Sequence, residues 1–239
     1  RMNTNDIIIA SRNVDTDDEL SLFVSTFPEK SDAEIVAVLA AWLSNGLTGE
    51  NYALHTIVDE IMQGNPSHYV ENYVPYMNFG DVASNQCFFR MFSYGNLDAL
   101  IQAIKRAKSQ YGGVQEAFEA VMTKKKRIKH VHEAFAVLFG GGTMFPTRKN
   151  NSTFYRYNLL YYWLTFKLKI WTLCPFDDVA LLPCNDKVFT EAFKRGLTKR
   201  KWKSTLVNVE ALTNTARSIF GENFSDFFKL YDVLFFSND

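Results

Sequence analysis

Two clusters in the C-terminal half of the chain contain the residue types that bind phosphate. The first cluster leads into a segment with helical apolar spacing, and it comprises Arg148, Lys149, Asn151, Ser152, Thr153 and, on the helix itself, Arg156. Free N–H groups and a partial positive charge at a helix N-terminus favour anions. We expect Ser152 or Thr153 to cap this helix and the loop to hold a nucleic-acid backbone without reading sequence. An ordinary capped helix behind a solvated loop is the alternative.

The second cluster follows another expected helix and surrounds Trp202. It comprises Lys194, Arg195, Lys199, Arg200, Lys201 and Lys203. The two clusters together would form a positive stripe, and about six to eight phosphate contacts along it would make binding depend steeply on salt. A solvated helix end is the alternative for this cluster.

The net charge of zero conceals an asymmetry between the two halves of the sequence. Residues 1–120 carry 7 Lys+Arg and 16 Asp+Glu, a balance of −9, whereas residues 121–239 carry 19 and 10, a balance of +9. Such an asymmetry favours an anionic partner for the basic half. Mutual attraction of the two halves, or charges scattered over solvated faces, would give the same count.

Composition excludes several other classes of protein. Hydrophobic residues make up 47% of the 239 residues, enough to bury a sizeable core. No apolar run reaches the roughly 20 residues of a membrane span, and no basic-then-apolar signal peptide is present. Three cysteines without CxxC spacing favour a reducing cytoplasm over a disulfide framework or zinc site. We expect no metal, since His130 and His132 diverge on a helix, and no cofactor, since nucleotide-binding motifs are absent.

Apolar spacing is helical nearly everywhere, which predicts an all-α fold. A capping box at Ser31 and Glu34 opens the first strongly periodic helix, and Asn96 is the expected N-cap of another. We expect two lobes, an acidic one over 1–120 and a basic one over 121–239, the latter with a hairpin-like element at 140–170. Expected helices run from 31 to about 46 and over about 50–63, 66–73, 97–110, 114–122, 127–139, 154–170, 186–195, 202–220 and 223–236. The aromatic helix 154–170 should be central and buried.

A resemblance to a known family rests on short motifs whose order is kept along the chain. The Pro-x-Asn-Asp element, residues 183–197, resembles the Pro-x-Asp-Thr-His-Val…Arg-x-x-x-Leu-Gly-Leu element of the helix–hairpin–helix DNA glycosylases. It also resembles that of a bacterial uncharacterised family, the domain of unknown function 2400. Further motifs similar to the latter family are Asp32–Ile35, Ala40-Ala41, Pro66–Tyr69, Phe88–Phe92, Asn96-Leu97, Phe145–Thr147, Arg156–Asn158, Trp163, Tyr231-Asp232 and Phe235.

The glycosylase resemblance implies a two-lobed helical fold in which a flipped base enters a cleft beside a catalytic carboxylate. This sequence departs from that pattern, because Asn185 occupies the position of the carboxylate and an amide carries no charge. Asp186 is adjacent but about 100° away around a helix. Lys167 lies 18 residues before Asn185, as a lyase nucleophile would, yet among apolar neighbours it reads as a solvated or snorkelling lysine.

Three hypotheses follow for the function. The first is DNA binding of base-repair type, with Asn185 or Asp186 at the cleft and, if the protein is an enzyme, a monofunctional glycosylase using Asp186 and water. The second is a catalytically inactive nucleic-acid-binding protein. The third is a helical protein–protein adaptor. The first two expect DNA as partner, and none expects a membrane.

Overall fold

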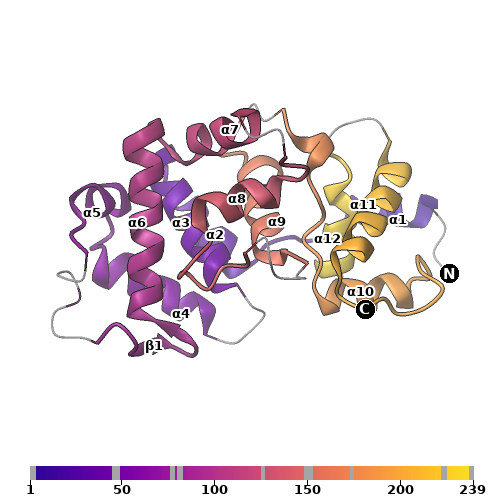
Figure 1. The fold of residues 1–239 in the computed structure, drawn as a ribbon. Helices are drawn as coiled ribbons and strands as arrows, with labels where there is room; N and C mark the ends of the chain where they lie inside the picture. Colours follow the sequence, from indigo (N-terminus) through magenta and orange to yellow (C-terminus); the bar gives the residue numbers. More distant parts are fainter. Residues whose placement is uncertain are drawn as a thin grey trace. The chain divides into compact units, whose positions relative to one another are not determined.

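The computed structural model describes residues 4–44, 49–75, 79, 83–124, 127–147, 153–172, 175–221 and 225–236 (Figure 1). Within these ranges the regular elements are helices, apart from one two-stranded antiparallel hairpin, β1 (Cys87–Phe89) and β2 (Phe92–Ser93), and turns and loops connect them. The expected all-α class is therefore confirmed. The hairpin was not anticipated because its strands are too short to show an alternating pattern.

The chain forms two compact units with interleaved sequence. Unit 1 comprises Arg1–Asp18, His130–His132 and Asn150–Asp239, and unit 2 comprises Glu19–Lys129 and Glu133–Lys149. These boundaries differ from the expected lobes because the N-terminal helix α1 (Thr4–Ser11) packs on the C-terminal helices α11 (Leu206–Phe220) and α12 (Phe228–Phe236). Figure 1 shows this indigo helix among the yellow ones.

Unit 2 is built around α3 (Lys30–Leu43), which is buried almost along its whole length. Four helices pack against it: α2 (Glu19–Ser25), α4 (Glu50–His55), α5 (Pro66–Asn72) and α7 (Val114–Lys124). The remaining helical elements are the π-helix η1 (Thr56–Ile61), α6 (Tyr94–Tyr111) and α8 (Val131–Phe139), whose first two residues belong to unit 1. The expected helices over these stretches are present with shifted ends.

The acidic residues at the start of α3 cap neighbouring helices instead of their own. Glu34 accepts hydrogen bonds from the backbone N–H groups of Val114 and Gln115 at 3.2 Å each, and Asp32 accepts from Ser67 N at 2.8 Å. The N-cap of α3 is Glu29, whose side chain makes no capping bond. The expected capping box at Ser31 and Glu34 is therefore wrong, because the buried carboxylate of Glu34 satisfies the free N–H groups of α7.

A capping box does occur at α6, one turn before the expected position. Ser93 is the N-cap and accepts from Asn96 N at 3.2 Å, while Asn96 accepts from Ser93 N at 3.0 Å. Asn96 is thus the third residue of the helix, and its amide also donates to Gly142 O at 2.7 Å. Thr143 and Phe145 are buried, and Trp42 Nε1 donates to Thr143 O. The first part of the expected hairpin-like element, residues 140–147, is consequently anchored in unit 2.

Unit 1 is built around aromatic side chains. Its elements after α1 are α9 (Tyr155–Tyr162), the π-helix η3 (Trp163–Lys167), a 3-10 turn η4 (Asp177–Val179), α10 (Asp186–Lys194), α11 and α12. Helix α12 packs against α1, α10 and α11. Tyr157, Tyr161, Tyr162 and Trp163 are at most 2% exposed, so the expectation that the aromatic helix is central and buried is confirmed.

Candidate nucleic-acid interface

Helix α11 holds the segment that leads into α10. Arg217 Nη2 donates to Asp177 O at 3.0 Å and to Ala180 O at 2.8 Å, and its guanidinium lies over the Phe227 ring at 4.8 Å. One turn earlier on the same helix, the Thr213 hydroxyl accepts from Leu182 N at 3.0 Å. Residues 180–184 are buried. Hydrogen bonds to α11 thus hold the segment immediately before the Pro-x-Asn-Asp element.

Asn185 is the N-cap of α10. Its backbone is extended, and Oδ1 accepts from Val188 N at 3.1 Å. This bond satisfies one of the free N–H groups of the first turn, a task that asparagine and aspartate perform about equally well. The preceding thiol, Cys184, is fully buried, and burial raises its pKa. Asn185 therefore has a clear structural role at the position where the resemblance places a catalytic carboxylate.

Asp186 and Lys187 are both exposed on the first turn of α10. The Asp186 carboxylate accepts a hydrogen bond from the Ser204 hydroxyl, 18 residues later. Lys187 points the other way, with Nζ 4.5 Å from the centre of the Phe235 ring on α12. The two residues therefore face different surroundings, as their positions one residue apart on a helix require.

The segment between α10 and α11 carries most of the second basic cluster. We call residues 198–205 the basic strap. Its four cations, Lys199, Arg200, Lys201 and Lys203, are exposed, and none of them forms an ion pair with a residue that the structure describes. By contrast, Lys194 at the end of α10 is 2.7 Å from the Glu191 carboxylate. The strap thus concentrates four cations without an ion pair to a described residue, and the Asp186 carboxylate on Ser204 is the negative charge in contact with it.

Hydrogen bonds fix the backbone of the strap at both ends. The hydroxyl of Thr198, which is 8% exposed, donates to Arg200 O at 2.8 Å. Lys203 O accepts from Asn208 Nδ2 at 2.8 Å and from Thr205 N at 2.9 Å, and Thr205 is the N-cap of α11. Helix α11 also forms hydrogen bonds with the segment before α10. Both ends of the stretch 177–205 are therefore hydrogen-bonded to the same helix.

The first basic cluster lies largely outside the described residues, which exclude Arg148, Lys149, Asn151 and Ser152. Thr153 is 9% exposed, and its carbonyl accepts from Asn158 Nδ2 at 3.2 Å. The N-cap of α9 is Phe154, in the left-handed region at φ 52° and without a side-chain bond. Thr153 is therefore not the cap that we expected, because the left-handed turn begins the helix one residue later. Arg156 is half-buried on the first turn of α9.

The opposite net charges of the two sequence halves do not correspond to opposite net charges of the two units. Unit 1 contains 14 Lys+Arg and 13 Asp+Glu, and unit 2 contains 12 and 13, so each unit is close to neutral. The difference arises because the acidic residues 1–18 belong to unit 1, whereas the basic stretches 124–129 and 148–149 belong to unit 2. An anionic partner would therefore bind local clusters of basic residues and not a basic lobe.

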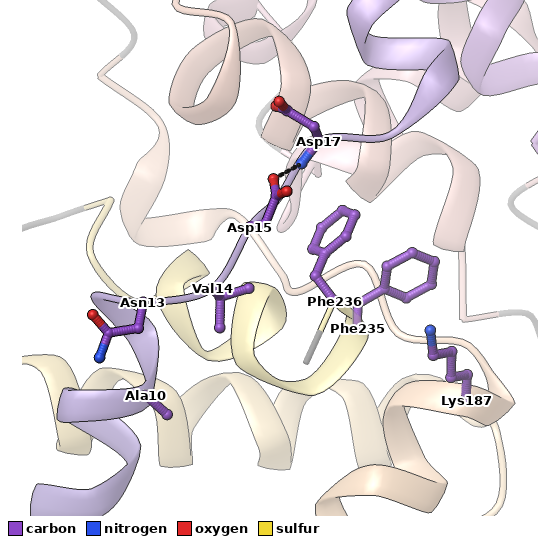
Figure 2. Close-up of a pocket in the computed structure, with 8 residues that line it drawn as sticks. All are labelled: Ala10, Asn13, Val14, Asp15, Asp17, Lys187, Phe235 and Phe236. Carbon is purple, nitrogen blue, oxygen red and sulfur yellow. Dashed lines mark hydrogen bonds between the residues drawn. The ribbon is translucent and has the colours of Figure 1, made fainter. Parts of the chain in front are cut away.

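An open cavity of about 530 Å³ lies beside α10 within unit 1 (Figure 2). Its lining residues come from α1, the loop after α1, α10 and α12, and they are Ala10, Asn13, Val14, Asp15, Asp17, Lys187, Phe235 and Phe236. Asp15 and Asp17 lie in the loop before α2, and Asp15 Oδ1 accepts from Asp17 N at 3.1 Å. Sequence reasoning missed this cavity because it joins segments more than 200 residues apart.

Lys167 is not the solvated or snorkelling lysine that its sequence context indicated. Its side chain is 9% exposed, and Nζ lies 3.0 Å from Asp18 Oδ2 and 4.8 Å from the centre of the Phe236 ring. It also donates to Thr16 O. The ammonium group therefore ties the loop after α1 to η3 and α12. A nucleophilic lysine would need a free, neutral amine, so this ion pair assigns Lys167 a structural role.

Asp232 on α12 forms a second buried polar contact, accepting a hydrogen bond from the Tyr162 hydroxyl. Burial raises the pKa of Asp232 from 3.8 to about 6, against the opposing effects of this hydrogen bond, Lys167 and Lys229. Burial, helped by the nearby Asp232 carboxylate, raises the pKa of Tyr162 above its ordinary value. The contact between Tyr162 and Asp232 is thus structural, and the Asp232 carboxyl group is the member that changes protonation in the acid range.

Among the described residues, no group of three or more His, Cys, Asp or Glu side chains is arranged to hold a metal ion. His130 Nε2 lies 3.0 Å from Glu210 Oε1, and the His132 ring stacks on Phe154 at 4.2 Å between centres. Within the same residues, no helix combines the length and hydropathy of a membrane span.

The chain matches the model of a known protein family over most of its length. The model of a family described as "Protein of unknown function (DUF2400)" matches residues 21–225. No curated protein and no solved structure matches the chain. The resemblance to the domain of unknown function 2400, inferred from the ordered motifs, is therefore confirmed.

The raised pKa of Asp232 predicts a specific pH dependence of stability. The folded chain holds the proton more tightly than the unfolded chain, so the contribution of Asp232 to the free energy of unfolding falls as pH rises from about 4 to about 6. Asp232→Asn stays neutral and should lose this dependence, so the variant should gain about 2–3 kcal/mol relative to wild type across that window. Urea unfolding at a series of pH values measures the difference.

Glu60→Gln, at an exposed position of η1 in unit 2, is the control and should follow the wild-type pH dependence. A constant difference between Asp232→Asn and wild type from pH 4 to 7 would show that this carboxyl does not change protonation on unfolding.

Proposed function

The chain belongs to the DUF2400 family, and we propose that it binds the phosphate backbone of DNA through the basic strap as part of base repair. The proposal rests on the charge and the fixed backbone of this one short segment. Four exposed cations occur within five residues of anchored backbone, and no described carboxylate pairs with them. Such cations bind phosphate by releasing condensed counterions, and this gives affinity without sequence specificity.

The anchored backbone strengthens this proposal. A flexible loop loses conformational freedom when it binds, and this loss reduces affinity. The strap avoids much of that loss, because Thr198 and Asn208 fix the carbonyls of Arg200 and Lys203. With four phosphate contacts, log K should fall with log salt with a slope of about −3 to −4.

The link to base repair rests on the element that precedes the strap. Residues 183–197 resemble the glycosylase element, and Asn185, at the position of its carboxylate, is the N-cap of α10. The amide gives no charge to stabilise a cationic sugar, which favours binding without excision. We therefore take DNA binding as the primary function of the protein.

A monofunctional glycosylase is the second candidate function, and one observation favours it. The Asp186 carboxylate is bonded to Ser204 inside the strap, so a DNA strand held there would pass close to it. Asp186 would then support departure of the base while water attacks the sugar. Among the described residues, no comparable contact favours the adaptor hypothesis.

The primary proposal predicts a loss of affinity when a strap cation is neutralised. Arg200→Gln should weaken binding to a DNA duplex by about tenfold, equivalent to ~1.4 kcal/mol, and reduce the salt slope by about 0.9. Fluorescence anisotropy across a salt series, with undamaged duplex and duplex carrying an abasic-site analogue, measures both effects. Lys169→Gln, an exposed lysine of unit 1 outside the strap, should bind like wild type.

Absence of wild-type binding at low salt would overturn the proposal. An equal loss of affinity in Lys169→Gln and Arg200→Gln would show that any surface cation suffices and that the strap is not the interface.

The second candidate function predicts that Asp186→Asn abolishes base excision but keeps DNA binding. The asparagine oxygen can still accept from Ser204, so the strap should stay in place while the charge is lost. A panel of damaged duplexes tests excision by wild type and variant, with Asp178→Asn, another exposed aspartate of unit 1, as control. Full excision by Asp186→Asn would exclude this carboxylate from the chemistry.

A further inference from the structure

Trp202 differs from the other tryptophans of the chain. Trp42, Trp163 and Trp171 are at most 2% exposed, whereas Trp202 is half-buried in the middle of the basic strap. Its indole makes no hydrogen bond, ring stack or cation–π contact with a residue that the structure describes. A buried tryptophan usually finds a hydrogen-bond partner for its N–H, so an indole with accessible surface and no such partner is open to contact with a ligand.

The cations next to Trp202 are also placed differently from other cations of unit 1. Elsewhere in unit 1, cations cover aromatic rings, since Lys187, Lys167 and Arg217 each lie within 5 Å of the centre of a phenylalanine ring. Lys201 and Lys203 are the immediate neighbours of Trp202, yet neither lies over its indole. The indole thus has no cation from the described residues over it, and cations within one residue on either side remain exposed to solvent.

We propose that Trp202 is a stacking platform for an unpaired base and that the strap consequently prefers single-stranded DNA to duplex. This inference rests on the proposed DNA binding and specifies its substrate. Bases in a duplex are stacked on one another and hide their faces, whereas an unpaired base exposes a face for an aromatic ring. Lys201 and Lys203 bind the phosphates on either side of the stacked nucleotide. Sequence preference is weak, because every base has such a face.

Stacking and charge contribute differently to binding, and this difference makes the inference testable. Removing a stacking ring lowers affinity for single strands without releasing fewer counterions, so the salt slope stays the same. Removing a cation lowers affinity and slope together. A role of Trp202 in supporting the strap backbone would instead change both single-strand and duplex binding when the side chain is truncated.

The experiment measures fluorescence anisotropy of labelled 15-nucleotide oligo(dT) and of a labelled 15-base-pair duplex with wild type, Trp202→Ala and Trp202→Phe. Wild type should bind the single strand more tightly. Trp202→Ala should lose about 5- to 100-fold in single-strand affinity, as expected for one base–aromatic stack, with an unchanged salt slope and less than about twofold change on duplex. Trp202→Phe should keep most of the affinity.

The outcomes separate the inference from the function on which it rests. If wild type binds both DNAs with steep salt dependence and Trp202→Ala behaves like wild type, the stacking role is wrong and the backbone binding stands. An equal loss on both DNAs, together with failure of Trp202→Phe to restore affinity, would also overturn stacking, because it indicates a support role. Absence of binding to either DNA at low salt would overturn both proposals.

Discussion

The attachment of one long stretch of chain to α11 is the constraint on which the candidate interface depends. Arg217 and Thr213 hold the segment before α10, and Thr205 and Asn208 hold the strap after it. The Arg217 guanidinium makes two bonds to carbonyls and lies over an aromatic ring, an arrangement suited to its planar shape. Burial lowers its pKa, opposed by Asp178 and Asp177. Exposed cations keep a defined position only because the backbone beneath them is fixed in this way.

The same attachment explains why Asn185 is compatible with the fold although it lacks a charge. Capping α10 requires only a side-chain oxygen, and the amide supplies it at 3.1 Å from Val188 N. The neighbouring residue, Asp186, carries a carboxylate instead. This carboxylate faces Ser204 of the strap and not the cavity beside α12. A chain with this arrangement retains a rigid helix start and a basic surface. Those two features suit binding, whereas excision would require the exposed Asp186 carboxylate to act from the strap side.

Sequence patterns predicted the helices well because helical periodicity extends over long segments. They predicted the burial of α9 and η3 from aromatic content, and the family from the order of short motifs. Contacts between segments far apart in the sequence could not be predicted from local patterns. Glu34 reads as a local cap but bonds to α7, 80 residues later, and Lys167 reads as exposed but pairs with Asp18, 149 residues earlier. The half-sequence charge balance misled for the same reason, since the N-terminal acidic residues fold with the C-terminal unit.

Hydrogen–deuterium exchange, measured with and without saturating single-stranded DNA at low salt, tests most directly whether the strap is the interface. We expect slower exchange in the backbone amides of residues 198–208, at the strap and the first turn of α11, with little change in α3 and α6 of unit 2. Protection confined to other segments, with unchanged exchange over 198–208, would show that the strap is not the interface.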